Sequence, residues 1–212
     1  MSELPAYLPG ILAAYAILVV GASSPGPAVA MILGIATTQG RGPSLVASLG
    51  IATGSMTLNL LTLVGVSVLL TQVAWAMLAV KLVGAAYLLW LSYGALRRAV
   101  APPPVIAAAD VPRISALRWF AAGYALQVTN PKAIVFWIAI AAVGAVTGAP
   151  LAVVLAFLLG GWVISFTSHA AWSLLLSSAP VRAAYARGRR WVDATLGAFF
   201  AFAAFKLATS ET

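Results

Sequence analysis

The chain has 212 residues, of which 63% are hydrophobic and 8% are charged, and its net charge is +8. A soluble domain is about half apolar and about a quarter charged, so this composition excludes a soluble globular enzyme. It predicts an all-α, polytopic membrane protein that forms a single transmembrane domain over residues 1–212. The sequence has no cysteine, which excludes disulfides and thiolate metal sites, and we expect neither a cofactor nor a metal ion.

Six hydrophobic runs long enough to cross a bilayer follow one another along the chain, at 7–37, 44–70, 73–96, 118–143, 150–177 and 191–209. All arginines lie at the first, third and fifth gaps between these runs (Arg41, Arg97, Arg98, Arg113, Arg118, Arg182, Arg187, Arg189 and Arg190). Short loops rich in arginine stay in the cytoplasm, so both termini are expected outside. The positive charge then reflects topology and contact with anionic lipid, and no nucleic-acid partner is expected.

Two proline segments occupy corresponding places in the first and fourth runs. Ser24-Pro25 and Asn130-Pro131 are 106 residues apart, which is half the chain length. The alternation of the gaps gives the fourth span the opposite orientation to the first. The sequence therefore predicts six transmembrane helices in a 3+3 inverted repeat, with halves at about 1–106 and 107–212, as in many secondary transporters.

Each proline segment predicts that one half-helix ends and another begins, because Ser and Asn are favoured N-caps and proline is favoured at the first helical position. The new helix start presents unpaired N–H groups to an anion, and a carboxylate is the anion expected there. Alternatively, each proline only kinks a packed helix. The first interpretation makes both segments candidate substrate-binding residues: Ser24, Pro25, Gly26, Pro27, Asn130 and Pro131.

Lys132 directly follows the second proline segment, about halfway along the fourth run. A lysine near the bilayer centre is costly and usually faces a cavity or a partner. We interpret it as the counter-charge of a substrate carboxylate. The alternative is a structural role, in which the ammonium donates to backbone carbonyls freed at the helix break.

Further polar residues at membrane depth complete the candidate set. Lys81 either faces a cavity or extends outward to the interface, and Asn59, Gln127 and Thr129 form hydrogen bonds either to a substrate or to another helix. His169 is a weak candidate for a proton relay, since a single histidine is more often a packing residue held by a hydrogen bond. No acid lies in the interior of any run: Asp193 is at the inner edge of the last one and is expected at the start of its helix, where an acid is ordinary.

The spacing Gly50-x-x-x-Gly54 in the second run is typical of close helix packing. Such a face serves contacts within one chain or between two copies. A homodimer is therefore one of the expected partnerships of this protein.

These residues also carry a resemblance to a known family. Ser24-Pro25-Gly26-Pro27, the Gly50 and Gly54 pair, Lys81-x-x-Gly84-Ala85-x-Tyr87-Leu88 and Asn130-Pro131-Lys132-Ala133-x-x-Phe136 resemble the LysE/RhtB family of bacterial amino-acid exporters. The resemblance implies a translocator in the bacterial inner membrane that exports amino acids or close derivatives, driven by protons. Because no span holds an acid, a cationic substrate side chain would lack a counter-ion, and neutral substrates such as threonine, homoserine or leucine-like compounds are expected.

Two other classes of protein are alternatives to an exporter of amino acids. An intramembrane enzyme needs a nucleophile with a base or a metal cluster, and one histidine without cysteine or intramembrane acid disfavours it. An ion or metal exporter needs oxygen, imidazole or sulfur ligands, and lysines in the spans disfavour that. A hydrogen bond between a serine and His169 at a wet cavity would favour the enzyme.

Overall fold

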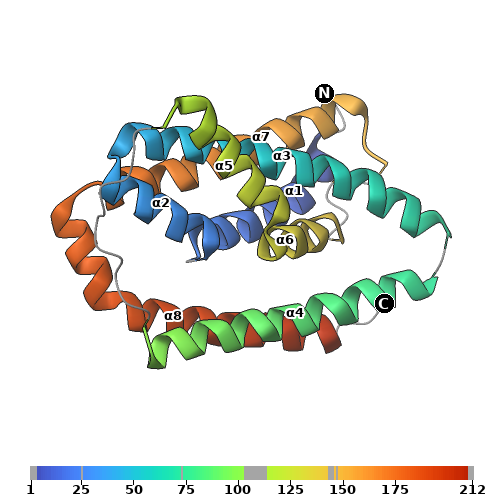
Figure 1. Ribbon diagram of the computed structural model, residues 1–212. Helices are drawn as coiled ribbons and strands as arrows, with labels where there is room; N and C mark the ends of the chain where they lie inside the picture. The colour runs from blue at the N-terminus through green and yellow to red at the C-terminus, as the bar shows by residue number, and fades with distance from the viewer. Residues whose placement is uncertain are drawn as a thin grey trace. The chain divides into compact units, whose positions relative to one another are not determined.

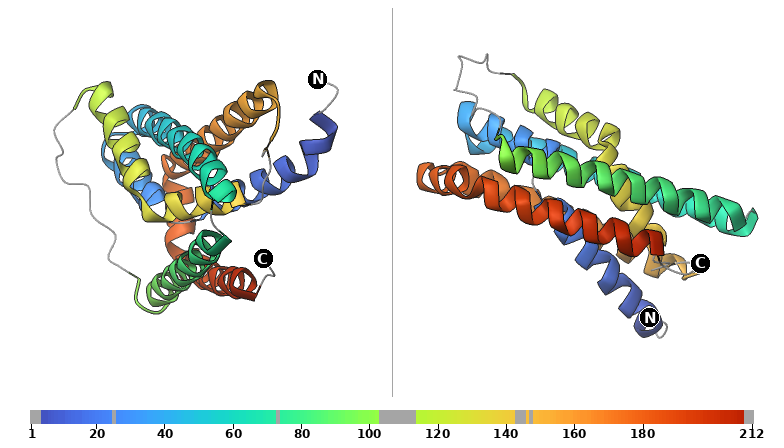
Figure 2. Two further views of the ribbon diagram at one scale, coloured as in Figure 1. Left: turned by 90° about the vertical axis from the view of Figure 1, so that its right-hand side faces the viewer. Right: turned by 90° about the horizontal axis from the view of Figure 1, so that it is seen from below.

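The computed structural model describes residues 4–24, 26–72, 74–102, 114–142, 146 and 148–209 (Figure 1, Figure 2). Within these residues the chain is all α-helical, without a strand. The helices are α1 (Leu4–Ser23), α2 (Pro27–Thr38), α3 (Arg41–Gln72), α4 (Ala74–Val100), α5 (Ala116–Thr129), α6 (Pro131–Ala142), α7 (Leu151–Leu176) and α8 (Ala179–Thr209). The predicted helical class is confirmed.

The helices divide into two compact units. The first takes α1, α2, most of α3, α5, α6 and α7, and the second takes α4 and α8. Each unit therefore combines one segment from each half of the sequence. The cavity described below lies within the first unit.

Three helical segments are long and apolar enough to cross a membrane among the residues described, Leu4–Ser23, Arg41–Gly65 and Leu151–Leu176. Pro27–Thr38 and Pro131–Ala141 are shorter apolar helices. Helices this long and this apolar are typical of segments that cross a lipid bilayer, so the chain is a helical membrane protein.

Both proline segments lie at helix boundaries. Helix α1 ends at Ser23 and α2 begins at Pro27, while α5 ends at Thr129 and α6 begins at Pro131. Proline has no N–H and a fixed φ, so it fits the first position of a helix and disrupts the interior. Pro25 lies outside the described residues.

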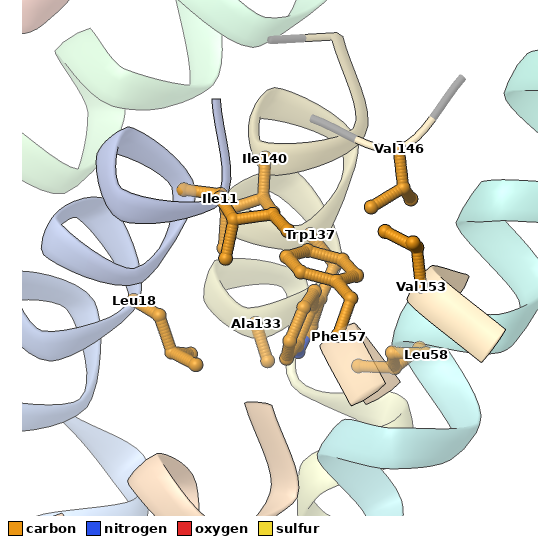
Figure 3. Packing of buried hydrophobic residues seen from close by; sticks show 10 residues of the cluster. Ile11, Leu18, Leu58, Ala133, Trp137, Ile140, Val146, Val153 and Phe157 are labelled. Carbon is orange, nitrogen blue, oxygen red and sulfur yellow. The ribbon is translucent and has the colours of Figure 1, made fainter. Parts of the chain in front are cut away.

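Large apolar side chains fill the centre of the first unit. Trp137 of α6 and Phe157 of α7 are 2% and 1% exposed, and they meet Leu18 of α1 and Leu58 of α3 (Figure 3). Tyr15 stacks on Phe157 with ring centroids 5.4 Å apart, and its hydroxyl donates to the Phe157 carbonyl at 3.0 Å. Helices surrounded by lipid associate through such close packing and hydrogen bonds, because lipid is as apolar as the core.

Glycines bring the backbones of α3 and α5 into contact. A Cβ added to Gly50 would lie 2.1 Å from the Phe120 carbonyl oxygen, and one added to Gly123 would lie 2.2 Å from that of Ala47. Gly54 packs closely on Gln127, because a Cβ added to Gly54 would lie 2.9 Å from the Cβ of Gln127. The small-residue face predicted in the second run therefore packs within the chain.

The second unit pairs α4 with α8. Ser92 is buried in this contact and donates to the Gly197 carbonyl at 2.7 Å. A Cβ on Gly197 would come within 2.6 Å of Leu96. The helices thus approach closely where the glycine stands.

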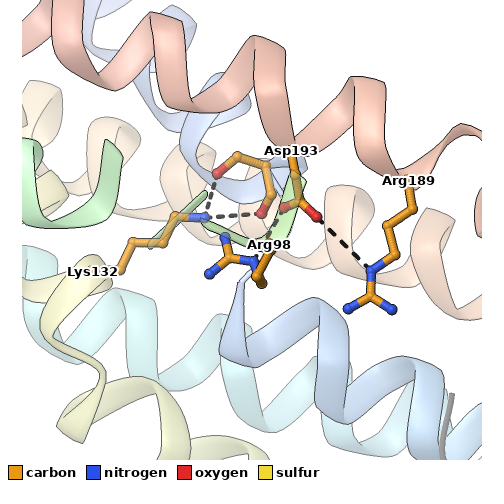
Figure 4. A network of polar contacts seen from close by, with 5 residues as sticks. Arg98, Lys132, Arg189 and Asp193 are labelled. Atoms are coloured by element: carbon orange, nitrogen blue, oxygen red, sulfur yellow. Dashed lines mark hydrogen bonds and ion pairs between the residues drawn. The ribbon is translucent and has the colours of Figure 1, made fainter. Parts of the chain in front are cut away.

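Asp193 is 2% exposed and lies inside α8, where it accepts a hydrogen bond from Arg98 at 3.2 Å and forms an ion pair with Arg189 at 3.9 Å (Figure 4). The expectation that Asp193 stands at a helix start is wrong, because α8 begins at Ala179 and the arginine-rich segment before residue 191 is itself helical. Arg98 from α4 and Arg189 from the preceding turn of α8 neutralise this buried acid.

Candidate functional site

A small cavity lies in the first unit where α1 ends and α2 begins, facing the junction of α5 and α6 and the middle of α3 and α7. Its volume is about 40 Å³, which holds a few water molecules. The polar residues that line it are Ser24, Ser55, Gln127, Asn130, Lys132, Ser165 and His169. Candidates from both proline segments are therefore brought to one place.

Lys132 is the charged group of this cavity, and its side chain is 8% exposed. Its Nζ donates to the Ser24 carbonyl oxygen at 2.9 Å and also contacts the Ser24 hydroxyl (Figure 4). The Phe136 ring centroid is 5.9 Å from the same nitrogen. The ammonium thus bonds to a carbonyl freed at the end of α1, which is the structural role considered from the sequence, and it does so in the wall of a cavity.

The two helix starts differ in their capping. Asn130 accepts the Lys132 backbone N–H on its Oδ1 at 3.1 Å, which confirms that Asn130 caps α6. Ser24 does not cap α2: its hydroxyl donates to the Gly21 carbonyl at 2.9 Å, and the N-cap of α2 is Gly26. The prediction for Ser24 is wrong because two further residues separate it from Pro27.

No described side chain caps α2, so the first-turn amides of this helix lack a side-chain acceptor. Ala28 and Val29, the second and third residues of α2, line the cavity together with Pro27. The positive end of this helix dipole therefore faces the same space as the Lys132 ammonium.

Two glycines make room for α6. A Cβ on Gly26 would lie 3.2 Å from Lys132 Nζ, and one on Gly21 would lie 2.7 Å from the Phe136 ring. A larger residue at either position would displace the side chain that forms the wall of the cavity. Gly26 therefore belongs to the site through its lack of a side chain.

Buried hydrogen bonds connect the opposite wall. Gln127 Nε2 donates to the Ser55 hydroxyl at 2.7 Å, and the Ser165 hydroxyl donates to the same oxygen at 3.1 Å. His169 is 4% exposed, and its Nδ1 lies 2.7 Å from the Ser165 backbone carbonyl. Because His169 bonds the carbonyl while the Ser165 hydroxyl is engaged with Ser55, the two do not form a nucleophile–base pair.

A second set of serines lies beyond His169, toward the end of α7, and Ser44, Ser48 and Ser173 of this set are buried. Ser173 contacts the hydroxyls of Ser44 at 2.9 Å and Ser48 at 2.8 Å, and the Ser177 hydroxyl donates to the Ser173 carbonyl at 2.5 Å. We call the residues Ser44, Ser48, Ser165, His169, Ser173 and Ser177 the serine seam. Sequence reasoning missed it, although the spacing of four residues from 165 to 177 puts one polar stripe on one helix face.

Several predicted residues lie elsewhere. Thr129 is exposed and donates to the Ala125 carbonyl at 2.7 Å, and Pro131 is exposed as well. Asn59 is 1% exposed but does not line the cavity, and its Nδ2 has no hydrogen-bond partner among the described residues. The side chain of Lys81 lies outside the described residues.

The lining suits a small zwitterion. An ammonium and a helix start attract a carboxylate, while hydroxyl, amide and imidazole groups accept or donate neutral hydrogen bonds. Within the described ranges, no group of three or more His, Asp or Glu residues is placed to hold a metal ion.

Comparison with known proteins gives one match. The family model of the LysE type translocators matches residues 19–211, which includes every described residue of the cavity except Leu18. No curated protein and no solved structure matches the chain. The match confirms the family resemblance drawn from the sequence motifs.

Proposed function

Because the chain belongs to the LysE type translocator family, we propose that it is a secondary active exporter of neutral amino acids or close derivatives across the bacterial inner membrane. Threonine, homoserine and leucine-like compounds are the candidate substrates. Export would be coupled to protons and would proceed by alternating access.

One observation carries this proposal: the Lys132 ammonium and the uncapped start of α2 face the same cavity. Both attract a carboxylate, and together they would replace part of its hydration at membrane depth. No acid lines the cavity in the part of the chain that the structure describes. A cationic substrate side chain would therefore meet Lys132 without a counter-ion, which favours neutral substrates.

The transport topology belongs to the same proposal. Helices α1 with α2 and α5 with α6 would each form one interrupted span, giving six spans in a 3+3 inverted repeat with both termini outside. A cavity of about 40 Å³ is too small for an amino acid. Binding would therefore separate Lys132 from Ser24, and the substrate carboxylate would take the place of the Ser24 oxygens.

Counterflow in proteoliposomes tests the function directly. Vesicles loaded with unlabelled L-threonine, L-homoserine or L-leucine should take up the labelled form of the same compound, and vesicles loaded with L-lysine should not exchange labelled L-lysine. An outward substrate flux should also follow an imposed proton gradient. Absence of exchange for every neutral amino acid would refute the proposal.

A further inference from the structure

His169 shares the cavity with Lys132 and belongs to the serine seam. We propose that Nε2 of His169 is the site for which a proton and the ammonium group of the substrate compete, so that this competition couples export to proton entry. The proposal rests on the proposed transport function and names the group that performs its coupling. It stands on the cavity, the hydrogen bond at Nδ1 and the seam.

The contact at Nδ1 fixes the tautomer of the ring. A backbone carbonyl oxygen can only accept, so the 2.7 Å contact with the Ser165 carbonyl requires that Nδ1 carry a hydrogen. In the neutral ring Nε2 then holds a lone pair. That lone pair accepts either a proton or an N–H of an ammonium group, and it cannot accept both.

Few of the described charged groups lie near His169, so its protonation is the main change of charge in the cavity. Lys132 on α6 is the other titratable group that lines the cavity within the described residues. Tyr15 on α1 donates to the Phe157 carbonyl and Tyr124 on α5 contacts the Thr57 hydroxyl, so both phenols are engaged elsewhere. The arginines of the neighbouring helices, Arg41 at the start of α3 and Arg118 near the start of α5, are exposed.

A zwitterion matches this pair of groups. Its carboxylate would bind Lys132 and the start of α2, and its ammonium would bind neutral His169. When His169 is protonated, the cavity holds two cations and repels the ammonium. Substrate binding and protonation therefore exclude each other.

The serine seam supplies a route for the proton. Within it Ser173, one turn after His169 on α7, is hydrogen-bonded to Ser44 near the start of α3, the end that carries Arg41. Hydroxyl groups both donate and accept, so a proton that passes from His169 to Ser173 across this turn can continue along the hydrogen bonds of the serines. Since the arginine distribution assigns this end to the cytoplasm, the seam leads from the cavity to the side on which the proton is released.

The cycle balances with one proton per substrate. On the cytoplasmic side the N–H bond at Nε2 breaks, the proton leaves along the seam, and the zwitterion binds. On the outer side the zwitterion leaves and a proton from outside forms the N–H bond again. The return step then carries that proton inward.

The first test measures protons released when L-threonine binds to the purified wild-type protein. A pH indicator in weakly buffered detergent solution should report release at pH values at which His169 is protonated, and the apparent affinity should fall about tenfold per pH unit in that acidic range. No release, with an affinity independent of pH over the whole range in which the protein stays folded, would overturn the proposal.

The second test uses His169→Gln, which keeps an acceptor oxygen but cannot titrate. This variant should lose the pH dependence of L-threonine binding and the transport driven by a pH gradient, and any counterflow that remains should be independent of pH. Thr167→Val is the matched control, since Thr167 is exposed on the same helix and bonds the Val163 carbonyl; it should behave as the wild type.

Ser173→Ala tests the proton route through the serine seam independently of the binding site at His169. It should slow transport driven by a pH gradient and leave the pH dependence of binding unchanged. If His169→Gln still accumulates L-threonine under a pH gradient as the wild type does, His169 is not the coupling group. Failure of wild-type counterflow with every neutral amino acid would instead refute the transport function, so the two failures are distinguishable.

Discussion

Replacing Lys132 with methionine removes the ammonium and keeps a flexible side chain of similar length. Nζ makes two contacts with Ser24 and stands in the cavity wall. If a substrate carboxylate takes these contacts over, the variant loses a charge-assisted hydrogen bond of about 1.5–3 kcal/mol. Since about 1.4 kcal/mol is a factor of ten, the Kd for L-threonine should rise about 10- to 150-fold.

The same substitution also leaves the Ser24 carbonyl without the donor that Lys132 supplies. An unsatisfied buried acceptor costs about 1–3 kcal/mol, so Lys132→Met should lower the Tm in detergent. Binding must therefore be measured below this Tm, by calorimetry or by scintillation proximity with labelled L-threonine. Size-exclusion chromatography at the same temperature checks that the variant remains folded.

Lys206→Met is the matched control, because it removes one lysine from the last hydrophobic run near its outer end. It should leave both the Kd and counterflow unchanged. If folded Lys132→Met binds L-threonine within about twofold of the wild type, the ammonium does not meet the carboxylate. Lys132 would then hold the end of α1 and have no part in recognition.

Five further substitutions test the packing. Gly50→Ala should lower the Tm markedly because its Cβ meets a backbone carbonyl at 2.1 Å, whereas Gly65→Ala on the same helix meets nothing within 4 Å and should be neutral or stabilising; equal Tm values would refute the close contact. Asp193→Asn should lower the Tm more than Arg189→Gln does, since it leaves both arginine partners without an acid. Asn59→Leu should raise the Tm, because it removes a buried amide nitrogen without a partner among the described residues, and should leave counterflow intact; lost counterflow in the stable variant would place Asn59 on the substrate path.

Local rules predicted one helix start well. Asn130 caps α6 at Pro131, as the preferences of both residues require. The same rules failed at Ser24, because Pro25 and Gly26 lengthen the connection and the serine hydroxyl turns back to Gly21. The chemistry of a cap is local, but its register depends on where the following helix begins.

Contacts between distant segments were less accessible from the sequence. Lys132 could be placed beside a helix break, but the partner of its ammonium, Ser24, lies 108 residues away. The serine seam depends on the register between α3 and α7, which hydropathy does not encode, so its serines were not recognised. The start of α8 was also missed, because the arginine-rich segment before residue 191 is helical without being hydrophobic.

The contact between α3 and α5 has a mechanical consequence. At Gly50 and Gly123 main chain lies against main chain, without a side chain between them that could change rotamer to absorb a displacement. The two helices therefore slide little and behave as a rigid wall of the cavity. The cavity would then enlarge on the side of α1 and α2. There the contact that has to break is the hydrogen bond from Lys132 to the Ser24 carbonyl at the end of α1.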